Sequence, residues 1–188
     1  MRHVISALVV NEPGVLASVA GMFAARGFNI DSLVVGRTED ANLSRMTIVV
    51  DADENTLEQV RKQLAKLVPV TKVKDFQNSA YIERDLALIT VSIGPEHRGE
   101  VIEIVTLFRG RVVDVSKDSV MVELAGTEQK IEAFVELMKP FGIRELARTG
   151  VIAMTRGMQH LHEAAAPTTP KERKRSLHAP AAVALPPS

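Results

Sequence analysis

The chain has 188 residues, enough for one large or two small domains. Its 23 basic and 23 acidic residues balance, so no net charge draws it to nucleic acid. It has no cysteine, which excludes disulfides, thiolate nucleophiles and cysteine-ligated metals. No apolar run reaches the roughly 18 residues of a membrane span, and the N-terminus lacks a signal-peptide pattern, so we expect a cytoplasmic protein without membrane association.

The first 78 residues show strand and helix signals in the order βαββαβ, which is the ferredoxin-like unit. Strands are expected at 3–10, 29–37, 46–51 and 70–76, and helices at 15–26 and 57–67. Gly27 should end the first helix, and Asn55 is a candidate N-cap of the second. This region is therefore predicted to be one α+β domain.

Residues 79–157 repeat that order of elements without repeating the residues themselves. Strands are expected at 86–93, 110–115 and 120–124, helices at 100–108 and from Thr127 to Met138, and an extended run at 143–154 interrupted by Gly150. We thus predict an α+β protein with two tandem ferredoxin-like domains, 1–78 and 79–157.

Residues 158–188 differ in composition from the rest. This segment is rich in proline and alanine, and its charges cluster at 171–175. Such a sequence cannot bury enough apolar surface to offset its ordering entropy. We predict a disordered tail, whose basic cluster is more simply a solvated charge run than a docking site.

Catalytic and metal-binding patterns are missing from the sequence. His160 and His162 precede Glu163 in a segment without a predicted scaffold, so a metal site is not expected there. No serine nucleophile elbow, dinucleotide-binding loop or phosphate-binding loop is present. A metallochaperone of this fold would need a cysteine pair, and an RNA-binding module would need strand aromatics, which 30–37 and 46–51 lack. No catalytic residue, metal or cofactor is predicted in this chain.

The segment Asn11-Glu-Pro-Gly, between the first strand and the first helix, is the most informative motif. It exposes a helix N-terminus whose free N–H groups can bind a carboxylate, and Gly14 has no side chain to keep a ligand away. A plain helix-start turn capped by Asn11 is an equally good explanation of this motif alone. However, Asn29 forms a second asparagine-bearing turn at the other end of the same helix. In a side-by-side dimer, one chain's turn can face its partner's second strand, which favours a site for a free amino acid.

Several segments together resemble a known family. They are 11–16, 27–33 and 43–48 in the first region, and 83–86, 108–115, 123–127 and 147–152 in the second. These segments are similar to the ACT domain and the C-terminal domain of the small, regulatory subunit of acetolactate synthase (acetohydroxyacid synthase). The resemblance covers about residues 1–157, and the tail departs from it.

The resemblance implies a non-catalytic regulatory subunit. Its partner would be the large catalytic subunit, which carries thiamine diphosphate, FAD and magnesium and condenses pyruvate with another 2-oxoacid in branched-chain amino acid biosynthesis. The small subunit would raise that activity and make it sensitive to valine, which would bind between the ACT domains of a homodimer.

The resemblance also implies which residues hold valine. One chain would contribute Asn11, Gly14, Val15 and Leu16, and the other Asn29 and Ile30. Backbone N–H groups near Gly14 would bind the carboxylate, carbonyl oxygens at Asn29 the ammonium, and Val15, Leu16 and Ile30 would wall the isopropyl group. Two alternatives remain: a freestanding ACT-domain sensor acting on a different enzyme, and a dimerisation module with a degenerate site.

Overall fold

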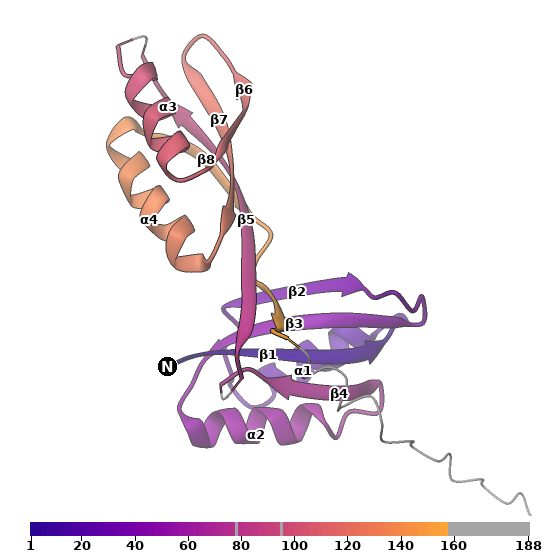
Figure 1. Ribbon diagram of the computed structural model, residues 1–188. Helices are drawn as coiled ribbons and strands as arrows, with labels where there is room; N and C mark the ends of the chain where they lie inside the picture. The colour runs from indigo at the N-terminus through magenta and orange to yellow at the C-terminus, as the bar shows by residue number, and fades with distance from the viewer. Residues whose placement is uncertain (78, 95, 158–188) are drawn as a thin grey trace, which may run out of the picture. The chain divides into compact units, whose positions relative to one another are not determined.

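The computed structural model describes residues 1–157 apart from 78 and 95 (Figure 1). The predicted tail, 158–188, lies outside the described residues. Within them the chain contains two antiparallel sheets, each with its own pair of helices. The expected α+β fold with two tandem ferredoxin-like βαββαβ units is confirmed.

The first unit contains four strands and two helices: β1 (Arg2–Val10), α1 (Val15–Ala24), β2 (Ser32–Arg37), β3 (Leu43–Asp51), α2 (Glu54–Leu64) and β4 (Val70–Asp75). The strand order is β2-β3-β1-β4, so β2 and β4 are the edges. β3 starts earlier than the sequence suggested, at Leu43, because it pairs with β1 along its whole length. β2 starts later, at Ser32, so Asn29 and Ile30 lie in the loop before it.

The core of this unit lies between the sheet and its helices, which cover one face (Figure 1). Alternate residues of β1 and β3 point into it, since side chains alternate between the faces of a strand. The central members are Ile5, Ala7, Val9, Met46, Ile48 and Val50 from the strands, and Val19, Phe23, Leu57, Val60 and Leu64 from the helices.

The second unit contains β5 (Tyr81–Ser92), α3 (Arg98–Leu107), β6 (Arg111–Val115), β7 (Ser119–Gly126), α4 (Glu128–Met138), a short 3-10 turn (Lys139–Phe141) and β8 (Ile143–Arg148). The strand order is β6-β7-β5-β8. Its core, like the first, is built from alternate strand residues packed against the two helices.

A further strand, β9 (Ile152–Thr155), pairs with the first residues of β5. The chain turns between β8 and β9 at Gly150, whose φ is 84°, where the sequence pattern suggested one interrupted run. Val151 and Ala153 pack with Val4, Val49 and Phe76 in a third, smaller core. β9 therefore covers part of the first sheet on the face opposite its helices.

The helix caps agree with one expectation and correct another. Thr127 caps α4 by accepting a hydrogen bond from Lys130 N, as predicted. The cap of α2 is Asp53, whose carboxylate accepts from Thr56 N at 2.7 Å, and not Asn55, which lies inside the helix. An aspartate suits this position because its charge also complements the positive helix N-terminus.

Candidate functional site

The connection from β1 to α1 is a tight turn that requires a glycine. Val15 N donates to Glu12 O at 3.5 Å, Pro13 and Gly14 are the central residues, and Gly14 has φ 85° and ψ −12°. These angles are those of the third residue of a type II turn, which needs a positive φ. Pro13 therefore lies in the turn before the helix, and Gly14 is the N-cap residue.

The helix N-terminus behind this turn is open. Gly14 provides no side-chain cap, and the first turn of α1 carries no acidic residue. The first N–H groups of any helix lack acceptors within it, and together with the helix dipole they favour an anion. A Cβ on Gly14 would meet no atom within 4 Å, so the space beside Gly14 is open.

The two apolar residues that follow Gly14 differ in their surroundings. Val15 is 7% exposed and belongs to the core of the first unit, so its side chain faces the protein interior. Leu16 is 48% exposed and remains available to a ligand or a second chain. Of this pair, only Leu16 has a side chain placed to wall a bound molecule.

Asn11 fixes the turn to the neighbouring loop instead of capping the helix. Its Nδ2 donates to Ala41 O at 3.0 Å, and its Oδ1 accepts from Ser44 Oγ at 3.2 Å. Its backbone N–H donates to Asn42 O at 2.7 Å. The interpretation of Asn11 as a helix cap is therefore wrong: it positions the turn against the loop between β2 and β3.

Asn29 and Ile30 lie at the other end of the sheet. Asn29 is exposed and its Nδ2 donates to Asp31 Oδ1 at 2.8 Å, while Ile30 packs partly against the core. Both segments are bonded to β3: Asp31, next to Ile30, donates its N–H to Val49 O, and Asn11 Oδ1 accepts from Ser44 Oγ. Val49 and Ser44 are about 17 Å apart along the strand at the usual rise per residue. One chain thus does not bring the Asn11 turn and Asn29 together.

Sequence reasoning missed a chain of ion pairs near the start of α4. Asp85 is 2% exposed and accepts from Arg148 Nε at 2.7 Å. Glu128 pairs with both Arg148 and Arg2, and Arg2 also pairs with Glu83 at 3.0 Å. Burial opposes the charged form of Arg2, but hydrogen bonds and charges from the two glutamates outweigh it and raise its pKa.

The signal for this network was present in the sequence. Ala87, Ile89 and Val91 alternate along β5 and face the core. Asp85 lies two residues before Ala87, so its side chain points to the same face. A carboxylate on a buried strand face requires a cationic partner. These groups hold elements together through ion pairs.

In the part of the chain that the structure describes, no helix is long and apolar enough to cross a membrane. The same part contains no group of three or more histidine, aspartate or glutamate side chains placed to hold a metal ion. The Asn11–Leu16 turn is therefore the candidate site that sequence and geometry both support.

Comparisons with known proteins agree with the fold. Residues 5–72 match the family model described as the AHAS small subunit-like ACT domain, and residues 84–157 match the one described as the small subunit of acetolactate synthase. A probable acetolactate synthase small subunit from Archaeoglobus fulgidus is 55% identical over 157 residues, which is 84% of this chain and 98% of that protein. The acetolactate synthase small subunit of Mycolicibacterium smegmatis is 48% identical over 82% of this chain and 91% of that protein. A probable acetolactate synthase small subunit from Methanothermobacter thermautotrophicus is 50% identical over 82% of this chain and 93% of that protein.

A solved structure gives the same result. The crystal structure of the acetolactate synthase small subunit from Thermotoga maritima superposes with a TM-score of 0.78 at 42% identity, covering 84% of this chain and 99% of that one. The fold and the family matches define an ACT-domain protein with a second ferredoxin-like unit. The chain belongs to the acetolactate synthase small-subunit family.

Proposed function

We propose that this chain is the non-catalytic regulatory subunit of acetolactate synthase. It binds the large catalytic subunit, raises its activity and makes it sensitive to feedback inhibition by valine. Family membership supports the partnership, because the relatives are named as small subunits of that enzyme. The open helix N-terminus behind Gly14 supports an effector site of amino-acid size.

The reaction belongs to the partner in this proposal. The large subunit carries thiamine diphosphate, FAD and magnesium, and it condenses pyruvate with a second 2-oxoacid on the path to valine, leucine and isoleucine. This chain contributes regulation alone.

The observation that carries the proposal is the position of β2. This strand is an edge of the first sheet, and its Arg37 end pairs with Ser44, the residue that binds Asn11. Its Ser32 end follows the Asn29 loop. If two copies pair antiparallel through β2, each Arg37 end lies beside the partner's Ser32 end. A homodimer of this kind brings each Asn11 turn to the partner's Asn29.

The ligand contacts follow from this pairing. The free N–H groups at the start of α1 bind the carboxylate of valine, and carbonyl oxygens at the partner's Asn29 bind its ammonium. Leu16 and the partner's Ile30 enclose the isopropyl group. Val15 contributes through its backbone, because its side chain lies in the core.

Reconstitution tests the proposal. The purified large subunit is assayed for acetolactate formation alone, with this chain, and with this chain plus valine. We expect activation by the chain and its reversal by valine. Activation without any valine response would favour a dimerisation module with a degenerate site, and no activation would favour an amino-acid sensor for another enzyme.

A further inference from the structure

The turn between β8 and β9 touches the edge strand β2 very closely. Gly150, in this turn, has φ 84° and lies against Ser32 and Val34 of β2. A Cβ on Gly150 would lie 2.6 Å from Ser32 Oγ and 2.9 Å from Val34 Cγ2, closer than non-bonded atoms approach in folded proteins. The N–H of Val151 donates to Ser32 Oγ at 3.3 Å. Glycine therefore permits a contact that any other residue would push apart.

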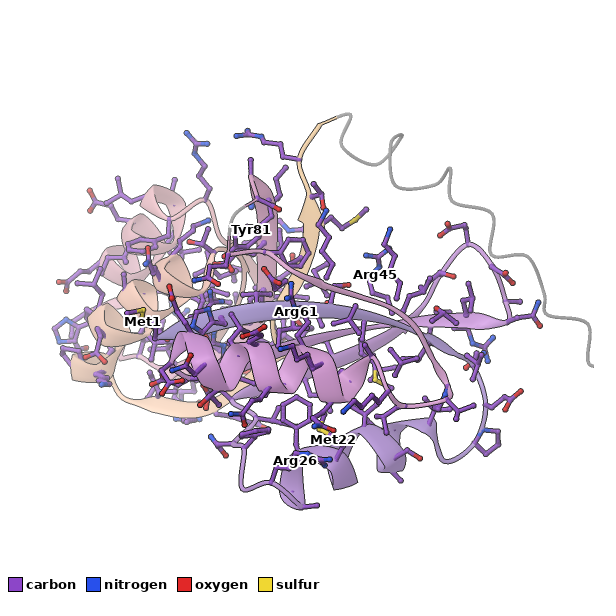
Figure 2. All side chains as sticks on the ribbon, turned by 90° about the horizontal axis from the view of Figure 1, so that it is seen from below. Met1, Met22, Arg26, Arg45, Arg61 and Tyr81 are labelled. Atoms are coloured by element: carbon purple, nitrogen blue, oxygen red, sulfur yellow. The ribbon has the colours of Figure 1, made fainter. Side chains whose placement is uncertain are left out.

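Ser32 directly follows the loop that carries Asn29. This loop connects α1 to β2, and Asn29 stands three residues before Ser32. The beginning of the loop is fixed, because Arg26 donates to Met22 O at 3.2 Å and to Gln63 Oε1 of α2 at 2.9 Å (Figure 2). A displacement of Asn29 is thus passed on mainly toward Ser32.

On its other side the turn is bound to β5 and its ion pair. The N–H of Thr149 donates to Leu86 O at 2.9 Å, and the Thr149 hydroxyl donates to Asp85 Oδ1 at 3.3 Å. Asp85 also accepts from Arg148, the residue before Thr149. Because protein interiors are close-packed, a group in tight contact moves with its neighbour. A shift of Ser32 therefore reaches Thr149 and, through it, β5.

We infer that the contact between Ser32 and Gly150 couples the Asn29 loop to the second unit. The inference rests on the proposed function for its ligand: valine, bound at Asn29, displaces the loop, and the second unit responds through this contact. Ser32 and Gly150 are positioning residues in this role and touch no ligand. The contact gives the second unit a physical connection to the effector site, which lies wholly in residues of the first unit.

Coupling of this kind acts in both directions, because it is a free energy that the two sites share. A change imposed at Gly150 must therefore reach the Asn29 loop even without valine. The N–H of Asp31, which donates to Val49 O at 2.9 Å, is a reporter within the loop. Its hydrogen exchange measures how readily the loop opens.

The first test compares two glycine variants of the full chain by amide hydrogen exchange in NMR. Gly150→Ala forces a Cβ against Ser32. In the control Gly142→Ala, the nearest atom is 3.7 Å from the new Cβ. Both glycines have a positive φ, 84° and 93°, so the backbone strain is matched. We expect Gly150→Ala to speed exchange of the Asp31 amide by about twofold or more, the lower limit for contacting residues, and Gly142→Ala to leave it unchanged.

The second test removes the Ser32 hydroxyl in the complex with the large subunit. Ser32→Ala loses the hydrogen bond from Val151 and adds no volume. Calorimetry should show valine affinity within about twofold of wild type, as for a residue that does not touch the ligand. Maximal inhibition by valine should fall at least about twofold. A purely structural role would lower affinity and inhibition together.

Thr71→Val is the matched control for Ser32→Ala. It also removes one hydroxyl that bonds to the backbone of another strand, since Thr71 Oγ1 donates to Leu8 O at 3.0 Å. Thr71 is on β4, the opposite edge of the same sheet. The variant should therefore keep both valine affinity and valine inhibition.

Two results would overturn the inference. One is wild-type exchange of the Asp31 amide in folded Gly150→Ala, and the other is full valine inhibition with Ser32→Ala. If Gly150→Ala does not fold, the valine response of Ser32→Ala decides. Failure of the proposed function gives a different pattern, because valine then fails to inhibit the wild type while the Asp31 amide still responds to Gly150→Ala.

Discussion

At the residue scale, Gly14 combines a backbone requirement with a ligand requirement. Its φ of 85° belongs to the left-handed region, where a residue with a Cβ costs about 1–2 kcal/mol. Nothing within 4 Å opposes a side chain, so this local strain is the main cost of substitution. Aspartate and asparagine tolerate the region better than most residues do. Substitution therefore tests the site without unfolding the protein.

We predict that Gly14→Asp abolishes valine inhibition and preserves activation of the large subunit. The added carboxylate fills the space of the ligand carboxylate and repels it. Loss of one or two charge-assisted hydrogen bonds, at roughly 1.5–3 kcal/mol each, weakens binding by about one to four orders of magnitude. Calorimetric titration with valine measures this, with circular dichroism as the check on folding.

Gly14→Asn is the matched control, because it has the same shape and the same tolerance of positive φ but no charge. It should bind valine more tightly than Gly14→Asp does. If folded Gly14→Asp binds valine with wild-type affinity, the Asn11–Leu16 turn is not the site.

The buried carboxylate of Asp85 leads to a second prediction. Asp85→Asn removes the charge that faces Arg148 and leaves a guanidinium without its main partner. Breaking a buried ion pair from one side typically costs about 3–5 kcal/mol, but Arg148 also has Glu128 at 3.6 Å, so we expect the lower part of that range. Urea denaturation measures the loss. An unchanged midpoint would show that the pair contributes no net stability.

At the scale of elements, the Asp53 cap of α2 predicts a dependence of stability on pH. The hydrogen bond from Thr56 N holds the pKa of Asp53 below its usual value. A lowered pKa means that this group stabilises the fold above its unfolded pKa and loses that contribution as pH falls through the folded value. In the variant Asp53→Asn, the side-chain amide oxygen would accept the same hydrogen bond without titrating.

The melting temperatures of the wild type and Asp53→Asn should therefore differ at neutral pH and converge in acid. Thermal unfolding followed by circular dichroism at a series of pH values measures this. Asp114→Asn is a control for a change of net charge alone, because the Asp114 side chain is exposed on β6 and caps no helix. A difference that stays constant into acid would contradict the assigned cap.

The elements themselves could be predicted largely from periodicity, but their ends depended on tertiary contacts. The β-branched run of β1 and the apolar stripes of the helices are local signals. By contrast, the early start of β3 follows from pairing with β1, which no local pattern reveals. Asn55 and Asp53 are both good caps, and the choice between them depends on where the backbone leaves β3.

The candidate site shows the same limit. Pro13 and Gly14 predict a turn at a helix start, and the open N-terminus follows from it. The role of Asn11 depends on Ala41 and Ser44, some thirty residues away, so sequence proximity suggested a cap instead. The packing of β9 on the first sheet was not predictable, because Val151 and Ala153 contact residues far away in the sequence.

At the scale of the whole molecule, the two units divide the proposed regulation. The Asn11 turn and Asn29 are both in the first unit, and the corresponding segment of the second unit, 94–99, lacks the Asn-x-Pro-Gly sequence. We predict that a chain of residues 1–78 binds valine but does not fully activate the large subunit. It should be less stable than the whole, because Val4, Val49 and Phe76 lose the cover of Val151 and Ala153.

Sedimentation and circular dichroism establish whether residues 1–78 fold and dimerise, and calorimetry measures valine binding. A chain of residues 1–157, which contains both units, provides the comparison. A folded, dimeric first unit that fails to bind valine would show that the second unit contributes to the site.

The last prediction concerns residues 158–188. The family match ends at residue 157, where the architecture of two units is already complete. We therefore expect truncation after Gly157 to leave both activation and the valine response unchanged.

The alternative is that the basic cluster at 171–175 binds an acidic surface of the large subunit. The two cases separate by salt, because exposed charge pairs weaken as ionic strength rises. Activation should then be measured for both chains at low and high salt. A loss of activation on truncation that high salt reproduces in the full chain would assign the cluster a docking role. Equal activation by both chains at low salt, where such attraction is strongest, would exclude that role.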